Sequence, residues 1–100
     1  MKRFDSRQVR EAIEYAGDGG QALHVWNPGK SYPDAPACFN KSRKGWGHLL
    51  DNDEERLVLT ARRLGVRRIV VAQRGKRGQH VDLCGKPLKR AIKESIKDEG

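Results

Sequence analysis

The chain has 100 residues, which is a typical length for one domain. Its 21 lysines and arginines outnumber 13 acidic residues, and the resulting net charge of +8 favours polyanionic partners. No apolar run is long enough to span a membrane, and no signal stretch follows the basic start of the chain. Two cysteines outside any Cys-x-x-Cys pair favour a reduced, cytoplasmic setting.

The first half of the chain predicts one helix and one strand. Apolar residues at helical spacing predict a helix over 6–16, which the glycines that follow would end. Residues 22–26 are typical of a short strand, closed by the turn signal Asn27-Pro28-Gly29. Residues 28–50 show no periodicity, and their aromatic side chains favour an ordered loop packed by its own residues.

The second half contains the clearest elements. An acidic start, an apolar stripe and a stop at Gly65 predict a helix over 52–64. The apolar segment that follows, 66–72, is typical of a strand covered on both faces. Residues 80–83 favour a short extended piece, and a last helix is expected over 87–97.

These elements predict a single α/β domain over residues 1–100. A strand, a helix and a second strand in succession imply a small parallel sheet with at least one right-handed βαβ crossover. The predicted crossover joins strands 22–26 and 66–72 through helix 52–64. Strand order beyond this pair and the oligomeric state do not follow from the sequence.

The predicted crossover would gather basic loops at one edge of the sheet. The segments that leave strands 22–26 and 66–72 would both start from carboxyl ends, where open α/β sheets bind ligands. The amino end of helix 52–64 would add partial positive charge there. The candidate residues for binding nucleic acid or phosphate are Lys41, Arg43, Lys44, Trp46, Arg74, Lys76 and Arg77.

Two of these features have alternative interpretations. Trp46 could stack on a base, or it could pack its loop onto the core, as buried tryptophans commonly do. The Arg-Gly-Lys-Arg-Gly run at 74–78 could bind phosphate or form a solvated turn. The glycines do not have the spacing of a phosphate-binding loop or a dinucleotide fingerprint.

Two histidines and a carboxylate form a candidate catalytic and metal-binding set. His48 and His80 lie near the expected edge, and Asp82 would share a strand face with His80. Such a set could bind a divalent metal and activate water for phosphate-ester hydrolysis. Asp34 is a candidate fourth ligand, whereas His24, within a strand, is interpreted as a core histidine.

The chain contains the motifs Trp46-Gly47-His48-Leu49, Leu64-Gly65 after an acidic helix start, His80-Val81-Asp82 and a Lys/Arg-rich last helix. Together these motifs resemble a family of short bacterial and phage proteins known as a domain of unknown function. The resemblance covers about residues 22–96 and implies that His48, His80 and Asp82 share a site. The family's first strand typically ends in two aspartates, where this chain has Trp26-Asn27, and helix 6–16 has no counterpart in it.

The leading functional hypothesis is a non-enzymatic module that binds nucleic acid or another polyanion through the basic loops. The alternative is a metal-dependent phosphoesterase or nuclease that uses His48, His80 and Asp82. A third interpretation is a protein-interaction component. No cofactor is evident beyond the divalent metal of the alternative, and the sequence leaves open whether the protein is an enzyme.

Overall fold

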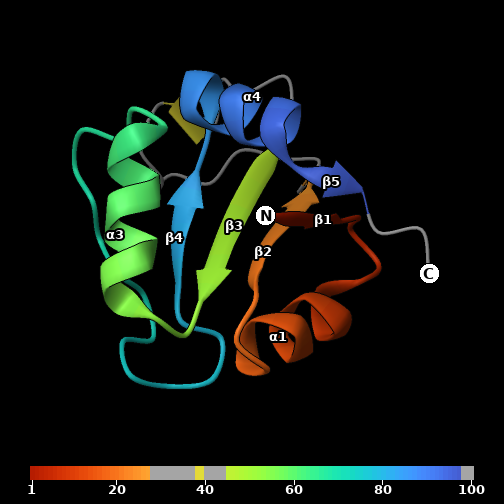
Figure 1. Ribbon diagram of the computed structural model, residues 1–100. Helices are drawn as coiled ribbons and strands as arrows, with labels where there is room; N and C mark the ends of the chain where they lie inside the picture. Colours follow the sequence, from red (N-terminus) through yellow and green to blue (C-terminus); the bar gives the residue numbers. More distant parts are fainter. Residues whose placement is uncertain (28–37, 40–44, 98–100) are drawn as a thin grey trace.

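The computed structural model describes residues 1–27, 38–39 and 45–97 of the chain (Figure 1). Its elements, in chain order, are β1 (Lys2–Phe4), α1 (Val9–Gly17), β2 (Gln21–Trp26), β3 (Trp46–Asp51), α3 (Glu54–Arg63), β4 (His80–Leu83), α4 (Gly85–Glu94) and β5 (Ile96–Lys97). The strands form one sheet in the order β4-β3-β2-β1-β5.

The sheet is mixed rather than purely parallel. β1 is parallel to both of its neighbours, β2 and β5, whereas β3 is antiparallel to β2 and to β4. A parallel β-α-β unit is present, but it consists of β1, α1 and β2. The α/β class is therefore confirmed, while the predicted location of the crossover is wrong.

Of the two strands of the predicted crossover, 22–26 is confirmed as β2, whereas the second strand is not formed. Residues 66–72 form no strand, and Ala72 alone makes an isolated bridge, to His80. The apolar run there is not covered on both faces, since Val70 is 62% exposed. Conversely, Trp46–Asp51 falls within the predicted loop 28–50 but forms β3, beside β2.

The three predicted helices are confirmed with shifted ends. The helix predicted over 6–16 is α1, and the one predicted over 52–64 is α3. α3 begins late because Asp53 is its N-cap, accepting a hydrogen bond from the backbone N–H of Arg56 at 3.1 Å. The helix predicted over 87–97 is α4, which ends at Glu94 because the following residues form β5 beside β1.

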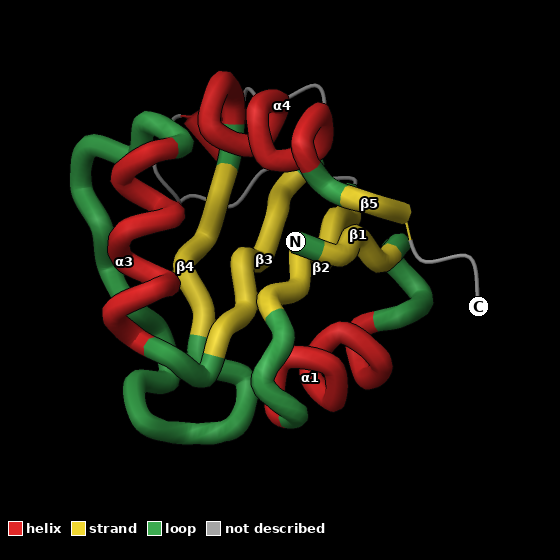
Figure 2. Tube along the Cα trace, in the orientation of Figure 1, coloured by secondary structure: helices red, strands yellow, loops and turns green. Residues whose placement is uncertain are grey.

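Helices cover the two faces of the sheet unequally. On one face, α3 and α4 pack their apolar stripes onto alternate strand residues, Leu23, Leu49, Val81 and Leu83. On the other face, α1 packs onto Phe4, Ala22 and Leu50. In Figures 1 and 2, α1 lies near the end of the sheet where β2 begins and β3 ends. Other strand residues of that face carry the site described below.

The two cysteines are paired. Cys38 and Cys84 form a disulfide with their Cα atoms 6.0 Å apart, which differs from the reduced state that the cysteine pattern favoured. A separation of 46 residues gives no local spacing from which the pairing could be recognised. The cytoplasmic setting stays a prediction. In the part of the chain that the structure describes, no helix has the length and apolarity needed to cross a bilayer.

Candidate metal centre

Antiparallel register places a row of polar side chains on one face of the sheet. His24 on β2 is opposite His48 on β3, and His48 is opposite Asp82 on β4. Successive residues of a strand point to opposite faces, so His80, two residues before Asp82, shares this face. The same face carries Ala22 and Leu50 beneath α1; His80 is opposite Leu50, whereas His24, His48 and Asp82 lie farther along the face.

His48, His80 and Asp82 come together as a compact cluster. Each can supply one ligand atom, and the three atoms lie within 4.8 Å of one another. Asp82 Oδ1 is 3.3 Å from Nε2 of His80 and 3.5 Å from Nε2 of His48. The Asp82 side chain is 49% exposed, so the cluster opens to solvent on that side.

The separations from Asp82 fit a bound metal ion, whereas the two histidine nitrogens, within 4.8 Å of each other, must lie at most about 4.2 Å apart to share one. Zinc–nitrogen and zinc–oxygen bonds of about 2.0–2.1 Å in a tetrahedral site place neighbouring ligand atoms about 3.3 Å apart. The two distances from Asp82 are close to that value. Two imidazoles and one carboxylate also suit Zn²⁺, Mn²⁺ or Fe²⁺, and they leave coordination positions for water or substrate.

A backbone contact orients His80 for this role. Its Nδ1 lies 2.7 Å from the carbonyl oxygen of Gly78 and donates a hydrogen bond to it. In the neutral imidazole, the other nitrogen, Nε2, then carries the lone pair. This is the nitrogen that faces Asp82. The tautomer that the backbone favours is thus the one that can ligate a metal.

A second histidine orients His48 in the same sense. His24 Nε2 is 3.4 Å from the carbonyl oxygen of Ser6, which can only accept, so His24 donates there and its Nδ1 is an acceptor. His48 Nδ1 lies 3.3 Å from that acceptor and donates to it. The lone pair of His48 is therefore on Nε2, toward Asp82. Outer hydrogen bonds of this kind fix the tautomer of metal-ligating histidines.

The pKa values within the cluster diverge. Burial lowers the pKa of His48 to about 4, with a further contribution from neighbouring His80. Burial also acts to lower the pKa of His80, but hydrogen bonds to Asp82 and to the Gly78 carbonyl outweigh it and raise that pKa. Burial opposes ionisation of Asp82, yet its bond to His80 lowers its pKa overall. In the metal-free protein, the shared proton thus belongs on His80, and a metal ion would replace it.

Aromatic rings flank the cluster. The ring of Trp26 stacks on that of His48, with centroids 4.0 Å apart. Trp46, the partner of Trp26 across the β2–β3 pair, donates from Nε1 to the carbonyl oxygen of Phe39 at 2.7 Å and meets the Phe39 ring edge-on. These contacts agree with the interpretation of Trp46 as a packing residue, and its stacking on a base is untested.

The predicted basic residues that the structure describes do not lie beside Trp46. Lys41, Arg43, Lys44 and the candidate ligand Asp34 lie outside the described residues. Arg74, Lys76 and Arg77 lie between Ala72 and β4, at the end of the sheet where β3 finishes, whereas Trp46 begins β3 at the other end. The shared edge required a strand at 66–72 parallel to strand 22–26, and residues 66–72 form no strand.

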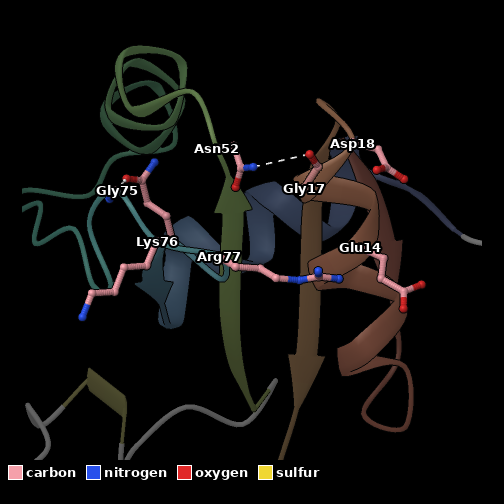
Figure 3. A pocket seen from close by; sticks show the side chains of 8 residues that line it. Glu14, Gly17, Asp18, Asn52, Gly75, Lys76 and Arg77 are labelled. Atoms are coloured by element: carbon pink, nitrogen blue, oxygen red, sulfur yellow. Dashed lines mark hydrogen bonds between the residues drawn. The ribbon is translucent and has the colours of Figure 1, made fainter.

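Near the end of α1, the basic loop borders a different cavity. It has a volume of about 620 Å³ and is lined by Lys76 and Arg77 together with the acidic Glu14 and Asp18 (Figure 3). Arg77 points across β3 toward α1, while Lys76 points away from it. Arg74 forms an ion pair with Glu54 of α3. Acidic neighbours therefore accompany these cations.

His24 is the residue that sequence reasoning missed as part of the site. It was interpreted as a core histidine, and it is indeed only 4% exposed. Its role depends on the β2–β3 pairing. The sequence pattern does not reveal this pairing, because residues 28–50 predict a loop. With β3 recognised, alternation along the two strands would have placed His24 and His48 on one face.

Comparisons with protein-family models, with curated proteins and with solved structures gave no match for this chain.

Proposed function

We propose that the protein is a metal-dependent hydrolase of phosphate esters, with the metal ion held by His48, His80 and Asp82. The observation that carries the proposal is the convergence of two imidazole nitrogens and one carboxylate oxygen within 4.8 Å. Hydrogen bonds from the Nδ1 atoms of both histidines direct the ligating lone pairs toward Asp82.

The arrangement supports hydrolysis for a chemical reason. A bound divalent metal polarises a phosphoryl oxygen and lowers the pKa of a water molecule that it coordinates. The three ligands leave positions for both, and the half-exposed carboxylate of Asp82 leaves the cluster accessible from solvent. A net charge of +8 attracts anionic substrates over longer distances.

The first experiment measures turnover of bis(p-nitrophenyl) phosphate with Zn²⁺, Mn²⁺ or Mg²⁺ added to metal-free protein. We expect metal-dependent release of nitrophenolate and its loss in His80→Ala and in Asp82→Asn. Asp18→Asn is the matched control for Asp82→Asn, because Asp18 is also an exposed aspartate but lies in the turn after α1. No turnover with any of the metals, or undiminished turnover in His80→Ala, would reject the proposal.

The non-enzymatic hypothesis makes a different prediction and is untested. Binding of nucleic acid through charge alone would weaken steeply with salt and would need no metal. Among the described residues, Arg74, Lys76 and Arg77 lie at the opposite end of the sheet from Trp46 and do not form one patch with it. Salt-sensitive binding that His80→Ala leaves unchanged, together with absent turnover, would favour it.

A further inference from the structure

A second cavity lies where three parallel strands end. β5, β1 and β2 run in the same direction, so their carboxyl ends meet at one edge of the sheet. A cavity of about 410 Å³ is located there, and its walls include Lys97 at the end of β5, Asp5 and Ser6 after β1, and Trp26 at the end of β2. This edge of an α/β sheet is the usual place for ligands, and the volume is within the usual range of ligand sites.

The cavity adjoins the candidate metal centre through two residues. Trp26 lines the cavity, and its ring stacks on the metal-site ligand His48. Ser6 also lines the cavity, and its carbonyl oxygen accepts the hydrogen bond from His24, which in turn bonds to His48. A molecule in the cavity would thus lie beside residues in contact with the metal ligands.

The lining combines apolar surfaces with charged groups. Phe4, Val25, Trp26 and Ile92 supply apolar and aromatic surface. Arg3 is fixed by the hydrogen bond from its Nη1 to the carbonyl oxygen of Ile92, and Lys97 adds a second cation. Asp5 adds a carboxylate and Ser6 adds a hydroxyl. A lining that combines aromatic and apolar side chains with hydrogen-bonding groups suits a planar heterocycle better than an aliphatic chain.

We propose that this cavity binds the nucleobase of a nucleotide whose phosphate reaches the metal centre. The inference rests on the proposed function for its phosphate half and names the substrate class of the same site. Stacking of a base on an aromatic side chain is sequence-tolerant, so Trp26 would accept different bases.

The test compares three probes on wild-type protein: adenosine, inorganic phosphate and adenosine 5′-monophosphate. Adenosine is added to metal-free protein, and quenching of tryptophan fluorescence is followed, with Trp26→Phe as the control that removes the reporter at the cavity and leaves Trp46. For the zinc-loaded protein, calorimetry compares the monophosphate with inorganic phosphate. We expect saturable quenching by adenosine, and affinity for the monophosphate at least about tenfold above that for phosphate.

A substitution in the cavity wall adds a second measurement. Val25→Phe narrows the cavity, and we expect it to weaken adenosine 5′-monophosphate about tenfold while leaving affinity for inorganic phosphate unchanged. Val66→Phe is the matched control, because Val66 is also a partly buried valine packed against the same core cluster and does not line the cavity.

The outcomes separate this inference from the proposed function. Zinc binding and hydrolysis of the nitrophenyl ester, with no adenosine quenching and equal affinities for monophosphate and phosphate, would overturn the nucleobase site alone. Adenosine binding without zinc binding would overturn the proposed function and retain the cavity as a nucleobase site.

Discussion

Replacing His24 by leucine tests whether the outer hydrogen bond controls the metal ligand His48. Leucine removes the acceptor, 3.3 Å away, to which His48 Nδ1 donates. A buried donor left without a partner costs about 1–3 kcal/mol. His48 can escape that cost by moving its proton to Nε2, but this tautomer has no lone pair for the metal.

The magnitude for metal binding follows from that choice. Restoring the ligating tautomer costs the same 1–3 kcal/mol, which corresponds to an affinity lowered about 5- to 150-fold. Losses of 10- to 100-fold are typical when outer-shell partners of metal ligands are removed. We therefore expect zinc affinity of His24→Leu to fall by at least about tenfold, measured by competition with a chromophoric chelator at pH 7.5.

His24→Asn provides the conservative control. Its side-chain oxygen can take the position of Nδ1 as an acceptor, so we expect affinity to recover most of the loss. A merely structural role for the buried ring would give equal losses in both variants. Affinity within twofold of wild type in His24→Leu, or Asn no better than Leu, would refute the reasoning.

Three further predictions concern stability. Since burial holds the pKa of His48 at about 4, below its ordinary 6.5, the unfolded chain takes up this proton first as the pH falls. We expect the free energy of unfolding of the metal-free protein to fall by up to about 3 kcal/mol between pH 6.5 and 4, and His48→Gln to show a flatter pH dependence in urea unfolding. An unchanged slope in that variant would contradict this expectation. Cys38→Ser removes a disulfide between residues 46 apart, and loop entropy predicts that the free energy of unfolding falls by about 4 kcal/mol relative to wild type without reductant. A decrease of less than about 1 kcal/mol would count against the disulfide. Asp51→Asn weakens the paired hydrogen bonds from Arg56 Nε and Nη2, at 2.6 and 2.7 Å, to a fully buried carboxylate, so we expect about 2–3 kcal/mol of destabilisation by thermal unfolding, and an unaltered midpoint would show that the pair contributes nothing.

The helices could be predicted from the sequence because their signals are local. Leu57, Ala61 and Leu64 recur at helical spacing, and all three are buried in the core. The helix boundaries moved because neighbouring residues can each act as a cap. The predicted start at residue 52 follows Asp51, whereas the observed N-cap of α3 is Asp53.

The sheet could not be predicted because strand pairing is not local. The apolar run 69–72 was the strongest strand signal, yet it is not a strand of the sheet. β3 was concealed by Gly47, where an added Cβ would come within 2.6 Å of Leu88 Cδ1 in α4. In the sequence, a glycine that allows a helix to pack closely on a strand cannot be distinguished from a glycine that interrupts a strand.

The candidate site shows a mixed result for related reasons. His48, His80 and Asp82 were grouped by their chemistry and by a family resemblance, and the structure does bring them together. The mechanism of convergence was wrong, because antiparallel register on neighbouring strands replaces the expected meeting of parallel carboxyl ends. His24 was missed because its significance depends on that register.

The most direct test of the metal centre is zinc K-edge X-ray absorption on protein loaded with one equivalent of Zn²⁺. We expect two imidazole nitrogens and additional oxygen ligands at about 2.0–2.1 Å from the zinc ion, without sulfur, and loss of one imidazole in His80→Ala. Failure to retain zinc, or the same spectrum in His80→Ala as in wild type, would contradict it.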